Sequence, residues 1–371
     1  MTTAKPFEND PRVVLTLDAG GTSFRFTAIA GNREVAPGVT LATRGDDLAA
    51  CLAQIVEGFS RVREQAGDAI AALSFAFPGP ADYAAGVIGD LGNLPAFRGG
   101  VALGPMLEER FGVPVFINND GDLFAYGEAL HGLLPEVNQL LAHSGSSKRY
   151  RNLLGVTLGT GFGGGIVRDG ELFVGDNGAA GEIWLERHKL EHGSPAEEGV
   201  SIRAVRGVYA RRAGLAPDEA PEPSEIAAIA RGKASGDGPA AREAFRRLGE
   251  VAGDAIANAL TLIDGLVVLG GGLSGAAHLF RAALLAELNG KLDTSSGPVN
   301  RLPCRVLDID DPAGLSALVA QHCEQLAIPG TDRKVAYAPQ KLTGIGVTRL
   351  GTTAAIALGA YAYALGEIAI S

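Results

Sequence analysis

Short apolar runs that end in glycine-rich turns constrain this chain more than any other feature. Three such junctions follow one another along the sequence: Val13–Leu17 before 18–22 (DAGGT), Leu153–Leu158 before 159–165 (GTGFGGG), and Gly265–Leu269 before 270–272 (GGG). In all, 52 of the 371 residues are glycine, roughly twice the usual share. Because glycine has no Cβ atom, it allows tight turns and lets backbone N–H groups approach a ligand closely. The pattern therefore indicates strand ends at which the backbone meets a bound molecule.

The composition excludes several classes of protein. With 46% apolar and 20% charged residues the chain can bury a sizeable core, and its length predicts two domains. The formal net charge is −10, whereas a free nucleic-acid binder is more often basic. No apolar leader and no apolar stretch of about 18 residues is present. Three widely spaced cysteines favour a reducing compartment and argue against a cysteine-ligated zinc. We expect a soluble cytoplasmic protein that binds neither nucleic acid nor membrane.

Hydrophobic periodicity predicts two α/β units in succession. The first is expected to hold three hairpin-connected strands, a helix over 46–64, a strand over 70–77, a helix over 101–111, a strand over 113–117 and a helix over 123–130. The second is expected to hold strands over 153–158, 265–269 and 305–309 and helices over 201–212, 224–230, 239–262 and 276–289, and the chain is expected to end in a helix over 352–365. Leu15–Thr22 (LTLDAGGT) and 156–163 (VTLGTGFG) resemble each other. This similarity hints at a duplication with a ligand-binding cleft between the halves.

The three glycine turns are candidate phosphate or nucleotide sites. At the first, Asp18 could hold Mg²⁺ directly or through water, while Gly20, Gly21 and Thr22 offer donors to a polyphosphate; a plain β-turn is the alternative. The turn 159–165 has the GxGxxG spacing, but a hairpin follows it instead of the helix that a dinucleotide site needs. The turn 270–275 has the same spacing with a helix after it, so a dinucleotide fold stays open there, although close approach to an adenosine is the better interpretation.

Four polar residues are candidates for chemistry on a hydroxylated substrate. Asp120, at a predicted strand end, could accept a proton from a hydroxyl that attacks phosphorus, with Asn119 binding a neighbouring hydroxyl. The alternative is a helix N-cap, a position that Asn and Asp favour. Glu182 and Glu197 could accept hydrogen bonds from paired sugar hydroxyls. Their alternative role is ordinary solvated charge.

Taken together and in this order, these motifs resemble the ROK family of bacterial sugar kinases and glucokinases, within the hexokinase/actin-like ATPase superfamily. The matching segments are LDAGGT (17–22), PGPAD with Gly79, Asn119-Asp120 followed by Gly127-Glu128, LGTGFGGGIV (158–167), AGEI (180–183) and VVLGGGLSG (267–275). The resemblance implies two ribonuclease-H-like α/β domains flanking a central cleft. The domains are expected at 1–124 plus 352–371 and at 125–351.

The resemblance also implies a role for each residue. Asp120 would be the general base in ATP-dependent phosphorylation of a hexose. Asp18 would lie near Mg²⁺, directly or through water. The nucleotide would be bound by Gly20, Gly21, Thr22, Gly159, Thr160, Gly161, Gly271 and Gly272, and the sugar by Gly79, Asn119, Asp120, Glu182 and Glu197. Dimers are common in the family, so a homodimer is expected.

Two departures from the family pattern favour an alternative function. Leu185 stands where ROK proteins commonly carry a histidine, and the Cys-rich zinc segment is missing, so no structural zinc is expected. His188 and His192 lack cysteine partners for a zinc. The alternative is a catalytically silent ROK-type protein that binds sugar or ATP. No function is predicted for the segment 295–330.

Overall fold

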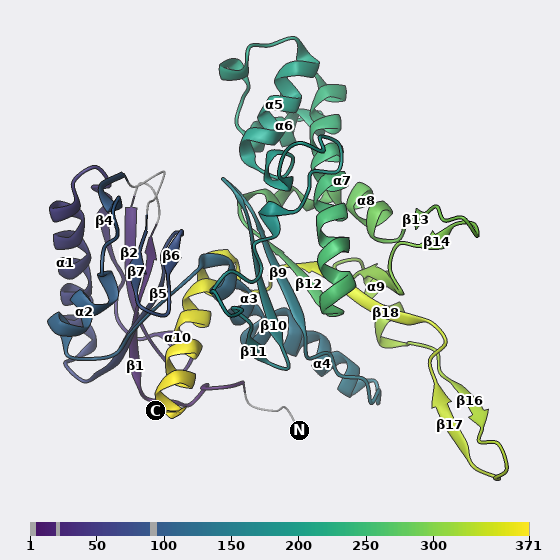
Figure 1. Ribbon diagram of the computed structural model, residues 1–371, viewed down its shortest axis with the longest axis horizontal. Helices are drawn as coiled ribbons and strands as arrows, with labels where there is room; N and C mark the ends of the chain where they lie inside the picture. Colours follow the sequence, from purple (N-terminus) through teal and green to yellow (C-terminus); the bar gives the residue numbers. More distant parts are fainter. Residues whose placement is uncertain (1–4, 20–22, 90–94, 371) are drawn as a thin grey trace. The chain divides into compact units, whose positions relative to one another are not determined.

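The computed structural model describes residues 5–19, 23–89 and 95–370 (Figure 1). The chain forms two compact units of mixed α/β structure. Unit 1 comprises 1–135, 165–181 and 348–371, and unit 2 comprises 136–164 and 182–347. The expected α/β fold class is confirmed, and the predicted domain boundaries stay a prediction. No helix within the described residues is both long enough and apolar enough to cross a membrane.

The sheet of unit 1 has the order β3-β2-β1-β5-β8, with β4 paired to β2. Its strands are β1 (Val13–Ala19), β2 (Ser23–Ala30), β3 (Arg33–Glu34), β4 (Val39–Ala42), β5 (Ile70–Ala76) and β8 (Val115–Asn118). The antiparallel opening is confirmed: β1 pairs with β2, and β2 with β3 and β4. β1, β5 and β8 are parallel neighbours. Their carboxyl ends therefore reach the same edge of the sheet.

Helices cover both faces of this sheet. α1 (Leu48–Ala66) buries Cys51, Ile55, Phe59 and Val62 against one face, where α2 (Leu103–Phe111) joins the same core. The N-cap of α1 is Asp47, whose side chain accepts the Ala50 N–H. α10 (Thr352–Ile370) packs on the other face and, with α3 (Asp120–His131), forms a close helix pair.

Glycines allow the α3–α10 pair to approach closely. A Cβ atom at Gly127 would collide with the backbone of Ala355, and one at Gly359 with the backbone of Leu123. Beside these glycines the fully buried Glu128 receives four hydrogen bonds. Its Oε2 accepts the Leu133 N–H at 2.8 Å, and its Oε1 accepts the Thr348 hydroxyl and the N–H groups of the next two residues. One carboxylate thus connects α3 to the segment that begins α10.

His131, at the end of α3, is expected to make the stability of unit 1 depend on pH. Its side chain is 2% exposed, and neither ring nitrogen has a hydrogen-bond partner among the described residues. Burial lowers its pKa to about 4, and the charge of Lys5 acts in the same direction. The folded state therefore binds fewer protons than the unfolded chain, whose imidazole titrates near ~6.5.

We expect the contribution of His131 to the free energy of unfolding to be complete above pH ~6.5 and to fall by roughly 3 kcal/mol as the pH drops to about 4. Urea unfolding of wild type and of His131→Leu between pH 4.5 and 7 tests this. The variant should show the weaker pH dependence, while the exposed control His143→Leu should follow wild type. Identical curves for wild type and His131→Leu would contradict the expectation.

Unit 2 is built on the parallel strands β9 (Leu153–Leu158), β12 (Leu266–Gly270), β18 (Lys341–Val347) and β15 (Cys304–Asp308), in that spatial order. The expected helices correspond to α5 (Ile202–Ala213), α6 (Pro223–Ala230), α7 (Gly238–Ile263) and α8 (Ala277–Leu288). Three elements were not predicted from the sequence: α4 (Leu133–His143), α9 (Pro312–Val319) and β18. β10 (Phe162–Arg168) passes from unit 2 into unit 1, where it pairs with β11 (Glu171–Leu172).

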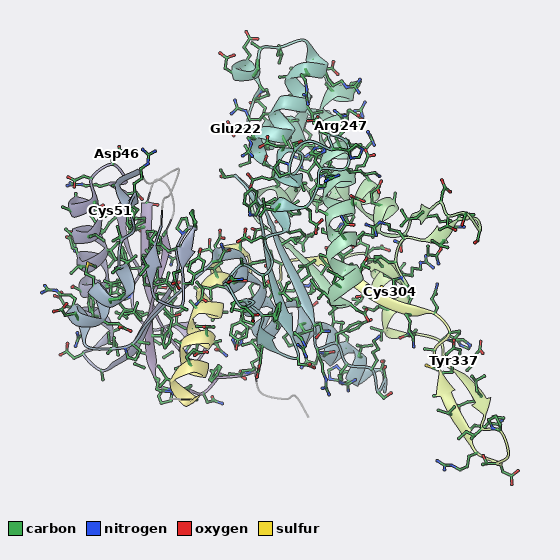
Figure 2. All side chains as sticks on the ribbon, in the orientation of Figure 1. Asp46, Cys51, Glu222, Arg247, Cys304 and Tyr337 are labelled. Atoms are coloured by element: carbon green, nitrogen blue, oxygen red, sulfur yellow. The ribbon has the colours of Figure 1, made fainter. Side chains whose placement is uncertain are left out.

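The segment 295–330 contains β14 (Val299–Asn300), β15, α9 and β16 (Glu324–Ala327). β14 forms a short hairpin with β13 (Lys291–Leu292), and β16 forms one with β17 (Lys334–Tyr337). The β16–β17 hairpin projects from unit 2, with all eight strand residues exposed (Figure 1). Tyr337 lies at its base (Figure 2).

Candidate active site

In unit 1 the candidate residues lie at the carboxyl ends of β1, β5 and β8. Asp18 is the penultimate residue of β1, Gly79 follows β5, and Asn119 and Asp120 follow β8. Since these strands are parallel neighbours, the residues share one edge of the sheet. Gly20, Gly21 and Thr22 lie outside the described residues.

Asn119 is the N-cap of α3, and Asp120 is the first residue of the helix. The Gly121 N–H donates to Asn119 Oδ1 and to Asp120 Oδ1, each at 2.8 Å. The capping role that the sequence left open therefore belongs to Asn119. The Asp120 side chain is exposed, and its charge is favoured by the positive end of the helix dipole.

Tyr83, which the sequence analysis missed, connects Asn119 to the turn that contains Gly79. Its hydroxyl donates to the Phe77 carbonyl at 3.0 Å and accepts a hydrogen bond from Asn119 Nδ2 at 3.4 Å. A Cβ atom at Gly79 would lie 3.0 Å from the same hydroxyl. No local pattern marks Tyr83, because its role depends on the start of α3, 36 residues further along the chain.

Asp18 lines a cavity of about 350 Å³ within unit 1. The β2 side of the cavity carries Arg25, whose guanidinium is 3.0 Å from Glu34. The first turn of α10, with Thr352 and Thr353, forms another wall. Glu34 is paired with Arg25, so the Asp18 carboxylate beside the threonine hydroxyls is the group that fits a Mg²⁺ ion with most of its water ligands kept.

The glycine run that begins at 159 also reaches unit 1. A Cβ atom at Gly165 would collide with the carbonyl of Gly121 and with Asp122. The end of this run therefore packs directly on the first turn of α3. Glycine at 165 is needed for that close approach. The contact is made with Gly121, the residue after the candidate base Asp120.

In unit 2 the turn after β9 is hydrogen-bonded to the side chain of Glu197. The Gly159 N–H donates to the Gly161 carbonyl at 2.9 Å, which closes a tight turn. The Phe162 N–H donates to Glu197 Oε2 at 3.1 Å, and a Cβ atom at Gly161 would lie 2.6 Å from that oxygen. Arg203 Nη2 donates to Glu197 Oε1 at 2.8 Å. The structure thus joins the predicted phosphate turn to the predicted sugar ligand Glu197.

Gly271 lies beside the same turn. Its φ is 80°, and a Cβ atom there would collide with the backbone of Leu158 at the end of β9. The hydroxyl of Ser274 donates to the Gly271 carbonyl at 2.7 Å, which fixes the start of η5 (Gly272–Ala276). A cavity of about 230 Å³ lies against η5, with Gly272, Leu273, Arg231 and His278 in its walls. This cavity can admit a flat heterocycle beside the glycine turn.

Glu182 precedes η2 (Ile183–Leu185), and its carboxylate accepts a hydrogen bond from Trp184 Nε1. The Leu185 side chain is 59% exposed. η2 contacts η3 (Ala196–Glu198), the element that carries Glu197.

His188 and His192 do not form a pair: His188 is buried and His192 is exposed. No group of three or more His, Cys, Asp or Glu side chains that could bind a metal occurs within 5–19, 23–89 and 95–370.

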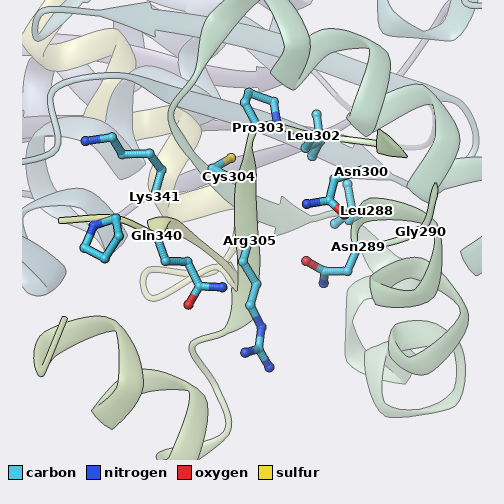
Figure 3. A pocket seen from close by; sticks show the side chains of 11 residues that line it. Leu288, Asn289, Gly290, Asn300, Leu302, Pro303, Cys304, Arg305, Gln340 and Lys341 are labelled. Carbon is cyan, nitrogen blue, oxygen red and sulfur yellow. The ribbon is translucent and has the colours of Figure 1, made fainter. Parts of the chain in front are cut away.

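A larger groove of about 480 Å³ lies elsewhere in unit 2, at the outer edge of β15 (Figure 3). Asn289, Arg305, Gln340 and Lys341 line it, and their side chains are all exposed. Arg305 and Lys341 point in different directions, so their charges do not converge on one point (Figure 3). It contains none of the predicted site residues.

Comparison with known proteins places these motifs in a family. The model of the ROK family matches residues 14–297. The crystal structure of a glucokinase from Parabacteroides distasonis is 52% identical, covers 97% of this chain and 99% of its own, and superposes with a TM-score of 0.88. A ROK family glucokinase from Streptomyces griseus, in complex with glucose and AMPPNP, is 19% identical, covers 94% of this chain and 98% of its own, and has a TM-score of 0.60, which is a likeness of fold.

Among curated relatives, an N-acetyl-D-glucosamine kinase from Vibrio cholerae is 32% identical over 166 residues, which are 45% of this chain. The chain spans about half the length of that relative.

Proposed function

Because the chain belongs to the ROK family, we propose that it is an ATP-dependent sugar kinase that phosphorylates a hydroxyl of a hexose, either glucose-like or an amino sugar. The observation that carries the proposal is the exposed Asp120 carboxylate at the start of α3, beside an asparagine held by Tyr83. The similarity to a glucokinase over nearly the whole chain supports the reaction type. The N-acetyl-D-glucosamine kinase supports the amino-sugar alternative.

In the proposed reaction, the Asp120 carboxylate accepts the proton of the attacking hydroxyl as its oxygen bonds to the γ-phosphorus of ATP. Asn119, Gly79, Glu182 and Glu197 bind the other sugar hydroxyls and hold the attacking oxygen in place.

Backbone N–H groups of the glycine turns at 18–22 and 159–165 bind the phosphates. The cavity beside Gly272 receives the adenine. Mg²⁺ near Asp18 would neutralise charge on the phosphates. A homodimer and a cytoplasmic location stay predictions.

One observation favours a silent sugar- or ATP-binding protein. Leu185 occupies the position at which the family commonly has histidine, and its exposed aliphatic side chain cannot donate a hydrogen bond to a sugar. A sugar that the family contacts through that histidine would lose one specific interaction here.

A coupled assay of ADP formation over glucose, mannose, galactose, N-acetylglucosamine and N-acetylgalactosamine tests the proposal. We expect saturable turnover with at least one of these sugars. Calorimetry with the same panel and with ATP identifies the silent alternative, for which sugar or ATP would bind without turnover. Absence of both turnover and binding would reject both functions.

A further inference from the structure

The segment that precedes Glu197 folds around the imidazole of His188. His188 is 4% exposed. Its Nδ1 accepts two backbone hydrogen bonds, from the N–H of Leu190 at 3.0 Å and from the N–H of Glu191 at 2.9 Å. Because Nδ1 is the acceptor, the ring is neutral and carries its proton on Nε2.

The two ends of this segment close on each other immediately before Glu197. The Ala196 N–H donates to the Glu186 carbonyl at 2.7 Å, and the His188 N–H donates to the Ser194 carbonyl at 3.0 Å. The loop is therefore closed by its own backbone and filled by one side chain. The residue that follows the closure is Glu197, whose carboxylate binds the turn after β9.

The opposite side of the imidazole is packed with equal closeness. A Cβ atom at Gly199 would collide with His188 Nε2 and would lie 2.9 Å from the side chain of Val251 on α7. The ring thus lies between the loop, Gly199 and α7, with little room to turn. The loop conformation and the ring position determine each other.

We propose that neutral His188 is the positioning residue for Glu197: through its two N–H···Nδ1 bonds it fixes the closed loop and thereby places the Glu197 carboxylate, and protonation of the ring releases it. The proposal rests on the proposed function only in taking Glu197 as a sugar ligand. A protonated Nδ1 cannot accept either N–H, so both bonds are lost together.

The surroundings of His188 determine the pH at which its ring is protonated. Burial lowers its pKa below the ordinary value and Arg247 on α7 (Figure 2) acts in the same direction, while Glu191 and Glu198 oppose the shift. His188 and Arg247 line a small cavity, and Arg211 on α5 lines it as well and adds a second positive charge. The loop is therefore fixed at neutral pH, and it is expected to loosen only as the pH falls below ~6.5 toward the lowered pKa.

The chain's single tryptophan, Trp184, lies four residues before His188 and reports on this region. We expect its fluorescence in wild type to show an acid transition that is missing in His188→Asn, since an amide oxygen accepts N–H groups but does not titrate. The difference between these two proteins isolates the imidazole from the carboxylates nearby. His192→Asn changes an exposed histidine of the same segment and should keep the wild-type transition.

Steady-state kinetics give the second measurement. His188→Leu removes the acceptor and should raise KM for the sugar about tenfold or more, with KM for ATP within about twofold of wild type. His188→Asn should keep both values within about threefold of wild type. If His188→Leu does not fold, the fluorescence titrations of wild type and His188→Asn still test whether His188 fixes the loop.

An acid transition in His188→Asn with the same midpoint and amplitude as in wild type, or a sugar KM unchanged in folded His188→Leu, would overturn the proposal. If wild type phosphorylates no sugar, the proposed function fails, while the fluorescence titration still tests the role of His188.

Discussion

Replacing Asp120 by Asn is expected to lower kcat for sugar phosphorylation by about 10²–10⁴-fold, the usual contribution of a general base. The amide keeps the size of the side chain but cannot take a proton from the attacking hydroxyl. The Gly121 N–H that Asp120 Oδ1 accepts is also bound by Asn119, so the start of α3 should remain folded. KM for ATP and sugar should change little.

The measurement is the coupled assay at saturating ATP and sugar. Asp68→Asn is the matched control, because this aspartate has a 98% exposed side chain and precedes β5, at the opposite edge of the sheet from Asp120. It should retain wild-type kcat. Turnover of Asp120→Asn within tenfold of wild type would remove Asp120 from the role of base.

Replacing Glu128 by Ala is expected to lower the free energy of unfolding by about 3–5 kcal/mol. The wild-type carboxylate receives hydrogen bonds from Leu133, Thr348, Arg349 and Leu350, and it is fully buried. Alanine removes the acceptor that all four donors share, at a position that is fully buried in wild type. Glu128→Gln should also destabilise, because its NH₂ group must face one set of donors.

Urea unfolding followed by circular dichroism measures this effect. Glu109→Ala removes an exposed glutamate from α2 and should change stability by no more than about 0.5 kcal/mol. A Glu128→Ala variant with the same stability as that control would show that the donors of 348–350 find other partners.

Local patterns predicted the elements that create the candidate site. The strand that contains Asp18, the strand before Asn119 and the strand before the glycine run at 159–165 were each visible as an apolar run followed by residues that end it, and each is confirmed as a strand. The predicted turn over 159–165 is shorter than expected, because β10 already begins at Phe162. Such signals are carried within one segment, because alternation and turn chemistry depend on near neighbours.

Local patterns failed where a residue acts on a distant segment. Glu128 was noted only as part of a motif, yet it binds a segment 220 residues away. His188 was considered only as a zinc ligand, and the structure shows it as the acceptor for two backbone N–H groups. Nothing in the neighbouring sequence distinguishes such a buried polar residue from an exposed one.

By itself the sequence determined the α/β class, the glycine turns and the family, because each rests on a short motif and on hydrophobic spacing. Only the tertiary structure decided that Tyr83 holds Asn119, that Gly161 makes room for Glu197, and that His188 fills the loop before it. The physical reason is that a hydrogen bond or a close approach depends on where two distant segments are packed, and the packing of the whole unit determines that distance.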